Sequence, residues 1–242
     1  MGFNQNETVG GILSEMDVLI RAEYLKERIL QTVNKIAENK EKYETAQESG
    51  ERADFPYMNM LFEGSLGTGK TTVANIMARL LFAKGIVTNP YPIIIKPSDF
   101  TSIYVGDLAE QLGKVLDKDR GGVVVIDEFY NFNRPHSSGN LADEAISVIM
   151  DRIDKYRDSM CLILCGHKNA MDKILNFNAG AIRRFPHVIE FKPYSDEDLL
   201  EIFKRCLQED EIEIEDDALV LVEKVIHAEN KPGRTIWKRR LY

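Results

Sequence analysis

The eight residues Gly-Ser-Leu-Gly-Thr-Gly-Lys-Thr at positions 64–71 constrain the fold of this chain most strongly. They fit the pattern G-x-x-x-x-G-K-T. The apolar run 58–62 precedes them, and residues 72–83 follow with apolar positions at helical spacing. A glycine-rich turn between a strand and a helix points successive backbone N–H groups at a bound phosphate. A random chain of this length has roughly a 1 in 100 chance of containing the pattern. The sequence therefore predicts a nucleotide-binding loop.

Individual residues of this loop have predicted roles. Lys70 is expected to reach the β- and γ-phosphates, and the Thr71 hydroxyl is expected to bind Mg²⁺. The predicted nucleotide-binding residues of the loop are Gly64, Ser65, Leu66, Gly67, Thr68, Gly69, Lys70, Thr71 and Thr72.

A second motif supplies two carboxylates. The run Val123-Val124-Val125-Ile126 is typical of a strand buried on both faces, and Asp127 and Glu128 follow it. Ligands bind beyond the carboxyl ends of the strands in open α/β sheets. Asp127 is expected to orient Mg²⁺ beside Thr71, and Glu128 to polarise the water that attacks the γ-phosphate. Because a small-molecule kinase must keep water away from that phosphate, this pair favours ATP hydrolysis.

The order of apolar and helical segments predicts the fold class. Short apolar runs alternate with helical segments, which is typical of a P-loop three-layer α/β/α core with a parallel sheet. The runs lie at 58–62, 93–95, 123–126, 161–165 and 188–191. After residue 191 the sequence predicts only helices, at about 196–208, about 215–229 and from about 234, as expected of a small all-helical C-terminal domain (the lid).

These patterns divide the chain into three parts. Residues 1–13 are predicted to be a flexible lead-in, residues 14–192 the nucleotide-binding core, and residues 193–242 the helical lid. Ser14 and Asp17 have the spacing of a capping box, which predicts a helix start. Ser195 and Asp198 have the same spacing at the start of the lid.

Composition argues against some classes of partner. The net charge of −8 makes nucleic acid an unlikely partner, because such binders usually carry a basic face. The sequence has no apolar stretch of the roughly 18 residues that a membrane span needs. It also lacks a signal-peptide pattern and has three scattered cysteines, so we expect a cytoplasmic protein.

With these motifs the chain resembles AAA+ ATPases, and more closely the CbxX/CfxQ family, over residues 14–242. Tyr104, Val105 and Gly106 are similar to the pore loop of that family. The resemblance implies that Tyr104 faces the central channel of a ring and grips a polypeptide. From periodicity alone, a surface or core aromatic of a β-to-α loop is the favoured explanation of Tyr104, and only the resemblance reverses that preference.

The resemblance also implies roles for two arginines. Arg184 aligns with the arginine finger that reaches the ATP of a neighbouring subunit, while Arg183 stands where the family has Ser. A solvated basic pair is the alternative. Arg234 is similar to the family's sensor 2, which contacts phosphates from the lid. Two further features depart from the family pattern: only eight residues follow Arg234, and Leu66 replaces the usual Pro.

The segment 161–171 resembles the strand that carries sensor 1. The family has Ala-Gly-Tyr where this chain has Cys165-Gly166-His167, and most AAA+ proteins have an Asn nearby. Lys168 or Asn169 could take that place here. We interpret His167 as the substitute for a packing ring rather than as an acid–base group.

Taken together, the resemblance implies a homo-oligomeric, hexameric ring that hydrolyses ATP with Mg²⁺ at its subunit interfaces and remodels or threads an unidentified protein substrate. One alternative is an AAA+ loader or assembly switch that acts on a protein or nucleic-acid complex without threading. Another is a small-molecule kinase, which would leave the helical C-terminal region unexplained.

Overall fold

The structure, a computed structural model, describes residues 8–18, 22–100, 107–118, 120–133, 141–175 and 180–230. Its centre is a parallel sheet of five strands in the order β2-β3-β4-β1-β5. The strands are β1 (Met60–Gly64), β2 (Ile93–Ile95), β3 (Val123–Ile126), β4 (Cys161–Gly166) and β5 (His187–Phe191). Each overlaps a predicted apolar run, so the predicted parallel α/β fold is confirmed.

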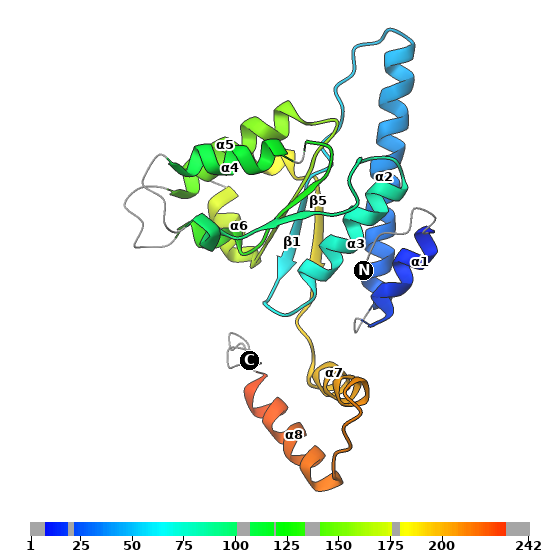
Figure 1. The fold of residues 1–242 in the computed structure, drawn as a ribbon, viewed down its shortest axis with the longest axis vertical. Coiled ribbons are helices and arrows are strands. Elements are labelled where there is room, and N and C mark those ends of the chain that lie inside the picture. Colours follow the sequence, from blue (N-terminus) through cyan, green and yellow to red (C-terminus); the bar gives the residue numbers. More distant parts are fainter. Residues whose placement is uncertain are drawn as a thin grey trace.

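Helices cover both faces of the sheet (Figure 1). One face carries α1 (Val9–Ser14), α2 (Ala22–Glu48) and α3 (Lys70–Ala83); the other carries α4 (Asp107–Lys118), α5 (Leu141–Lys155) and α6 (Lys168–Leu175). Successive strand residues point to opposite faces. Val123 and Val125 therefore join the core under α2 and α3, whereas Val124 and Ile126 join the core under α4 and α5. This double burial explains why β3 is apolar at every position.

The N-terminal region corrects two predictions. Residues from Val9 on form a helix rather than a flexible lead-in, and Ile12 is completely buried against the α2–α3 core. Thr8 caps this helix by accepting the Gly11 N–H at 3.2 Å. Ser14 ends the helix instead of starting one, and its hydroxyl donates to the Gly11 carbonyl at 2.7 Å. Six residues with two glycines give too little periodicity for the sequence to reveal this helix.

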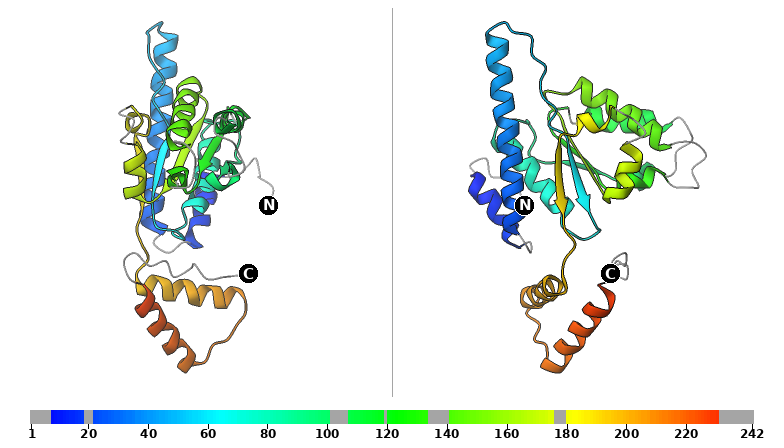
Figure 2. Two further views of the ribbon diagram at one scale, coloured as in Figure 1. Left: turned by 90° about the vertical axis from the view of Figure 1, so that its left-hand side faces the viewer. Right: turned by 180° about the vertical axis from the view of Figure 1, so that it is seen from behind.

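The C-terminal helices α7 (Asp196–Glu209) and α8 (Asp216–Glu229) lie beyond the carboxyl ends of the strands, apart from the sheet (Figures 1 and 2). The predicted capping box at Ser195 and Asp198 is confirmed, with both reciprocal hydrogen bonds present. The helix expected from about residue 234 lies outside the described residues. Within the part of the chain that the structure describes, no helix has both the length and the apolarity to cross a membrane.

Candidate active site

The phosphate loop leaves β1 at Gly64 and enters α3 at Lys70, as predicted. Gly67 and Gly69 have φ angles of +77° and +88°, which glycine adopts without the steric cost that other residues meet. At Gly64 the constraint is space. A Cβ there would lie 2.5 Å from the Phe191 carbonyl oxygen. The glycines thus let the backbone turn tightly beside β5, and Leu66 lies exposed at the tip of the loop.

Lys70 lies inside this loop and is only 7% exposed. Its Nζ donates to the carbonyls of Gly64 at 3.1 Å and Ser65 at 2.6 Å, while the Thr68 hydroxyl donates to Ser65 at 2.8 Å. Burial lowers the pKa of Lys70, whereas Asp127 and Glu128 are among the groups that raise it. The ammonium group is therefore held by main-chain oxygens, with the two carboxylates of β3 near enough to act on its charge.

The loop and the end of β3 meet through Thr71 and Asp127. The Thr71 hydroxyl donates to Asp127 Oδ2 at 3.3 Å, across 56 residues of sequence. The Asp127 N–H donates to the Ile95 carbonyl at 2.9 Å, which ties the end of β3 to β2. Hydroxyl and carboxylate oxygens are ligands that Mg²⁺ accepts, together with phosphate oxygens and water. These two side chains thus fit the predicted Mg²⁺ site.

Glu128 occupies an unusual backbone conformation. Its φ is +52°, in the left-handed region that costs a non-glycine residue of the order of 1 kcal/mol. Its N–H donates to Asp127 Oδ1 at 2.9 Å, and its Oε2 accepts the Asn131 amide at 2.7 Å. The Glu128 carboxylate just beyond β3 is therefore fixed by Asn131, a residue that the sequence analysis missed.

The end of β4 brings His167 to the same edge of the sheet. Since β4 lies between β3 and β1, its carboxyl end falls between the carboxylates and the phosphate loop. The His167 ring packs against Tyr130 with a centroid distance of 5.5 Å, as the packing interpretation expects. Burial lowers the pKa of His167, and Lys70 lowers it further while Glu128 opposes the shift.

The two predicted sensor 1 candidates, Lys168 and Asn169, are both exposed at the start of α6. Lys168 Nζ is 3.9 Å from Glu63 Oε2, and the Lys168 side chain is 67% exposed. Asn169 is exposed in the first turn of α6. In the described part of the chain, neither side chain makes a hydrogen bond or ion pair with Lys70, Asp127 or Glu128. The structure thus brings His167, rather than these two residues, toward the loop.

Arg184 lies at the opposite, amino edge of the sheet, in the 3₁₀ turn Ile182–Arg184 that precedes β5. Its Nε and Nη2 donate to the two carboxylate oxygens of Asp154 at 2.8 and 2.7 Å, and its Nη1 donates to the Gly180 carbonyl at 2.9 Å. The hydrogen bond from Arg184 lowers the pKa of Asp154. Arg183 is exposed. Sequence patterns gave no sign of the Asp154 partner, because it lies 30 residues away.

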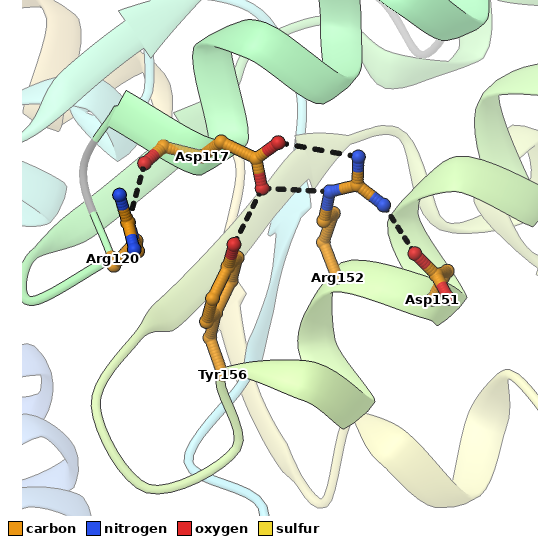
Figure 3. A network of polar contacts seen from close by, with 5 residues as sticks. All are labelled: Asp117, Arg120, Asp151, Arg152 and Tyr156. Atoms are coloured by element: carbon orange, nitrogen blue, oxygen red, sulfur yellow. Dashed lines mark hydrogen bonds and ion pairs between the residues drawn. The ribbon is translucent and has the colours of Figure 1, made fainter.

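Two further contacts fix this region. Asn59 is buried and bridges two elements: its amide donates to the Arg184 carbonyl at 3.0 Å, and its oxygen accepts the Leu162 N–H at 2.9 Å. The helix that carries Asp154 is held to α4 by the network in Figure 3, where Asp117 accepts hydrogen bonds from Arg152 and Tyr156.

Two predicted features, the pore loop and sensor 2, cannot be placed. Tyr104, Val105, Gly106 and Arg234 lie outside the described residues.

A pocket of about 310 Å³ opens next to the phosphate loop. It lies between α2 and the segment that joins β5 to α7. Its lining residues are Tyr24, Leu25, Thr68, Glu190, Phe191, Lys192 and Tyr194. The Lys192 ammonium lies 5.1 Å from the centre of the Tyr24 ring, as in a cation–π contact. Aromatic side chains and a cation beside a phosphate loop suit a flat, polar ring joined to phosphates.

Residues 60–193 match the profile of the family described as ATPase family associated with various cellular activities (AAA). This match covers more than half of the chain, so the protein belongs to the AAA family of ATPases, and membership implies ATP binding. The site geometry agrees, since the loop and both β3 carboxylates lie inside the matched residues.

Named relatives confirm the resemblance to the CbxX/CfxQ family. Protein CfxQ of Xanthobacter flavus is 34% identical over 71% of this chain and 54% of its own length. Stage V sporulation protein K of Bacillus subtilis is 32% identical over 88% of this chain and 66% of its own. The chloroplastic ribulose bisphosphate carboxylase/oxygenase activase of Cyanidioschyzon merolae is 34% identical over 71% and 59%. The chain thus spans 54 to 66% of the length of these relatives.

Proposed function

We propose that this protein hydrolyses ATP with Mg²⁺ at the subunit interfaces of a homo-oligomeric ring, and that the cycle remodels or threads a protein substrate. The contact between Thr71 and Asp127 carries the proposal, because it joins the phosphate loop to the strand end that bears Glu128. An AAA ATPase with both halves of a hydrolytic site in one place has the parts that phosphoryl transfer to water needs.

Each residue has a proposed role in the reaction. Main-chain N–H groups of residues 64–70 and the Lys70 ammonium bind the phosphates. Thr71 and Asp127 hold Mg²⁺, which supplies charge neutralisation at the β- and γ-phosphates when bound. Glu128 orients and polarises the attacking water, and Asn131 keeps its carboxylate in place. The strained backbone at Glu128 supports this role, since such strain is often stored at functional sites.

The pocket beside Thr68 is the proposed site of the adenine and ribose. Its lining includes Tyr24 from α2 and Lys192 and Tyr194 from the connection to α7. A base bound there would touch the segment that carries the lid helices. Binding of the nucleotide would therefore bias the angle between the core and the lid. Arg234, which lies outside the described residues, would add a contact from the lid to the phosphates.

The proposals of a ring and of a polypeptide substrate rest on the resemblance to the CbxX/CfxQ family. Tyr104, Val105 and Gly106 are the proposed substrate contact, and the named relatives include an activase of another protein. Because this chain spans only part of those relatives, their substrates are not transferred to it. The proposed substrate is a polypeptide, without a named identity.

Native mass measurement of a Glu128→Gln variant, with and without ATP, tests the proposal. This variant should bind ATP without turning it over, so it should accumulate a ring in the ATP-bound state. A six-fold mass that forms only with ATP supports the proposal. A monomer at saturating ATP contradicts the ring. A Tyr104→Ala variant should keep its basal hydrolysis but lose any stimulation by a polypeptide substrate.

A further inference from the structure

We propose that Asp196 and Asn230 are positioning residues for Arg234: they hold the end of α8 beside the nucleotide pocket, so that Arg234 reaches the phosphates of bound ATP. The inference rests on the proposed function, which places ATP at the phosphate loop and gives Arg234 its contact. It is drawn from the described contacts between the start of α7 and the end of α8.

The start of α7 has a well-defined place. Ser195 caps the helix by accepting the Asp198 N–H at 3.2 Å, and the Asp198 carboxylate accepts the Ser195 N–H at 2.6 Å. Residues 192–194 join this start to β5, and Tyr194 lines the pocket beside the phosphate loop. Asp196, in the first turn of α7, is therefore held close to this pocket.

Three hydrogen bonds tie the end of α8 to the start of α7. The Asn230 amide nitrogen donates to Asp196 Oδ1 at 2.6 Å and to the Tyr194 carbonyl at 3.2 Å, which uses both of its N–H groups. The other Asp196 oxygen lies 2.8 Å from Nδ1 of His227 in the last turn of α8. Figure 2 shows the two helix ends side by side. We call Asp196, His227 and Asn230 the lid clasp.

The charge of Asp196 strengthens the lid clasp. The hydrogen bond from Asn230, followed by that from His227, holds the pKa of the Asp196 carboxyl below its usual range. The carboxylate is therefore ionised at neutral pH and accepts from both partners. Hydrogen bonds to an ionised group are stronger than those between neutral groups.

Apolar packing alone gives this helix pair little to fix its angle. Of all the residues of α7 and α8, which the structure describes completely, only Leu199 is buried. Regions with few buried apolar contacts open at a low cost in free energy. Because α8 has 14 residues, it is about 21 Å long, so a small change of angle at its start moves Asn230 a long way. The lid clasp joins the end of α8 back to α7 and removes this freedom.

The lid clasp also lies close to Arg234 along the chain. Arg234 follows Asn230 by four residues (234 minus 230), and four residues span at most about 14 Å. Because Asn230 contacts the carbonyl of Tyr194, a residue of the pocket, this tether keeps Arg234 near a nucleotide bound there. The long arginine side chain adds to the reach, and its guanidinium suits phosphate oxygens.

Titration of variants with ATP tests the positioning role, in a Glu128→Gln background that keeps the ATP intact. Arg234→Ala should weaken ATP binding by about tenfold or more, as expected for the loss of a charged hydrogen bond. Asn230→Ala and Asp196→Ala should each weaken it several-fold, and by no more than Arg234→Ala does. The matched control is Asp217→Ala, at an exposed acidic residue in the first turn of α8, which should bind ATP as the parent does.

A double-mutant cycle separates positioning from a merely structural role. If the lid clasp acts through Arg234, adding Asn230→Ala to Arg234→Ala should change the Kd of ATP by less than about twofold. A merely structural role would weaken ATP binding equally with and without Arg234, because the pocket residues at 192–194 would shift in both backgrounds. Thermal midpoints of the same proteins show that each variant is folded.

Two nearly isosteric substitutions repeat the test without removing a side chain. Asn230→Asp sets a second carboxylate against Asp196, so it should open the lid clasp by repulsion and weaken ATP binding. Combining it with Asp196→Asn restores a donor opposite an acceptor, so the double variant should recover part of the lost affinity. Failure of this recovery, in folded proteins, would contradict a role for the pair.

Other outcomes would also overturn the inference. Parent-like ATP affinity in both Asn230→Ala and Asp196→Ala would show that the lid clasp positions nothing, and equal losses in both arms of the cycle would make it structural only. Parent-like affinity in Arg234→Ala would leave nothing to position, while hydrolysis by the wild-type chain would keep the proposed function intact. A wild-type chain that binds no ATP would instead reject the proposed function, and this inference with it.

Discussion

The two edges of the sheet hold their charged residues in opposite ways. At the carboxyl edge, main-chain carbonyls hold Lys70, and a single amide holds the Glu128 carboxylate. At the amino edge, Asp154 and Arg184 satisfy each other and anchor on neighbouring elements. The first arrangement leaves charge and hydrogen-bonding capacity for a ligand. The second uses that capacity to fix geometry, so substitutions at the two edges should affect different properties.

The largest effect is expected for Glu128→Gln at the carboxyl edge. Turnover should fall by about 10³-fold, since the amide cannot polarise water as a general base does. ATP affinity and the free energy of unfolding should stay close to wild type, because no other residue depends on that charge for packing. Steady-state ATPase assays, nucleotide titration and urea unfolding measure the three quantities. Glu38→Gln, on the exposed face of α2, is the control. Rapid hydrolysis by Glu128→Gln would remove this residue from the reaction.

At Gly64, on the carboxyl edge, the backbone should not tolerate an added side chain. A Cβ at Gly64 would lie 2.5 Å from the Phe191 carbonyl oxygen and 2.7 Å from its Cβ. Because backbone atoms must move, we expect Gly64→Ala to lower the free energy of unfolding by about 3 kcal/mol and to weaken ATP binding. Gly85→Ala is the matched control. Its φ is +65° with open space around it, so a loss of about 1 kcal/mol is expected there. Equal losses in both variants would show that the close approach of β1 and β5 is unimportant.

At the amino edge, Asn59→Ala should have a larger effect on the free energy of unfolding than on kcat. The substitution leaves the buried Leu162 N–H and the Arg184 carbonyl without their partner, at a cost of about 2 kcal/mol. Urea unfolding should register this loss, and kcat should fall only as far as the turn before β5 loses order. Asn169→Ala, at an exposed asparagine of α6, should change stability by less than about 0.5 kcal/mol. A stable Asn59→Ala protein would weaken the contrast between the edges.

His167 offers a finer test of the carboxyl edge. If its ring serves mainly to pack on Tyr130, His167→Phe should keep turnover within a few-fold of wild type. His167→Ala should lose about 1 kcal/mol of stability with the ring contact. Parallel measurements of kcat and unfolding separate the two effects. A tenfold fall in kcat for His167→Phe at unchanged stability would show instead that an imidazole nitrogen takes part in the reaction.

Patterns among neighbouring residues predicted the features that depend on neighbouring residues, such as buried strands and tight turns. Val123–Ile126 is apolar throughout because both faces of β3 are covered, and Gly64, Gly67 and Gly69 stand where the backbone needs them. The parallel sheet then brings Thr71 to Asp127, because residues that bind ligands in open α/β sheets lie beyond the carboxyl ends of the strands.

Contacts set by register between distant segments were not predictable in the same way. The partnership of Arg184 with Asp154 depends on how η4 (Ile182–Arg184) lies against the end of α5. Asn59 bridges two elements through the pairing of β1 with β4, in which Met60 aligns with Ile163. No periodicity marks either residue. The burial of Ile12 likewise depends on a surface made by α2 and α3, which a short glycine-containing segment does not signal.

The smallest effects concern two carboxylates whose pKa values shift in opposite directions. At the carboxyl edge, burial raises the pKa of Glu63; Asp172 and Glu190 add to the shift and Lys168 opposes it. At the amino edge, the hydrogen bond from Arg184 lowers the pKa of Asp154 despite some burial, and the Tyr57 hydrogen bond and the charges of Arg184 and Arg157 also lower it. A raised pKa means that the ionised form is less favourable in the folded state, so Glu63 reduces stability once it is ionised. A lowered pKa means the reverse for Asp154, whose contribution is present above its unfolded pKa and is lost as the pH falls through its folded pKa.

The two neutral variants should therefore differ in sign at neutral pH. Glu63→Gln should unfold at an equal or higher urea concentration than wild type at pH 7, and Asp154→Asn at a lower one. Each difference should be about 0.5 kcal/mol, because the Asp154 side chain is 42% exposed and its ion pair is screened by solvent, while Lys168, 3.9 Å from Glu63, offsets part of the burial cost of that carboxylate. The Glu63 difference should shrink as the pH falls through its raised folded-state pKa and vanish below the ordinary carboxyl pKa of about 4. The Asp154 difference should shrink only below that ordinary value, as the pH falls through its lowered folded-state pKa. Urea unfolding of the three proteins at pH 7 and near pH 3 measures the four differences. A loss of stability in Glu63→Gln at pH 7 would show that its contact with Lys168 outweighs burial, and the contrast between the two edges would then not extend to their carboxylates.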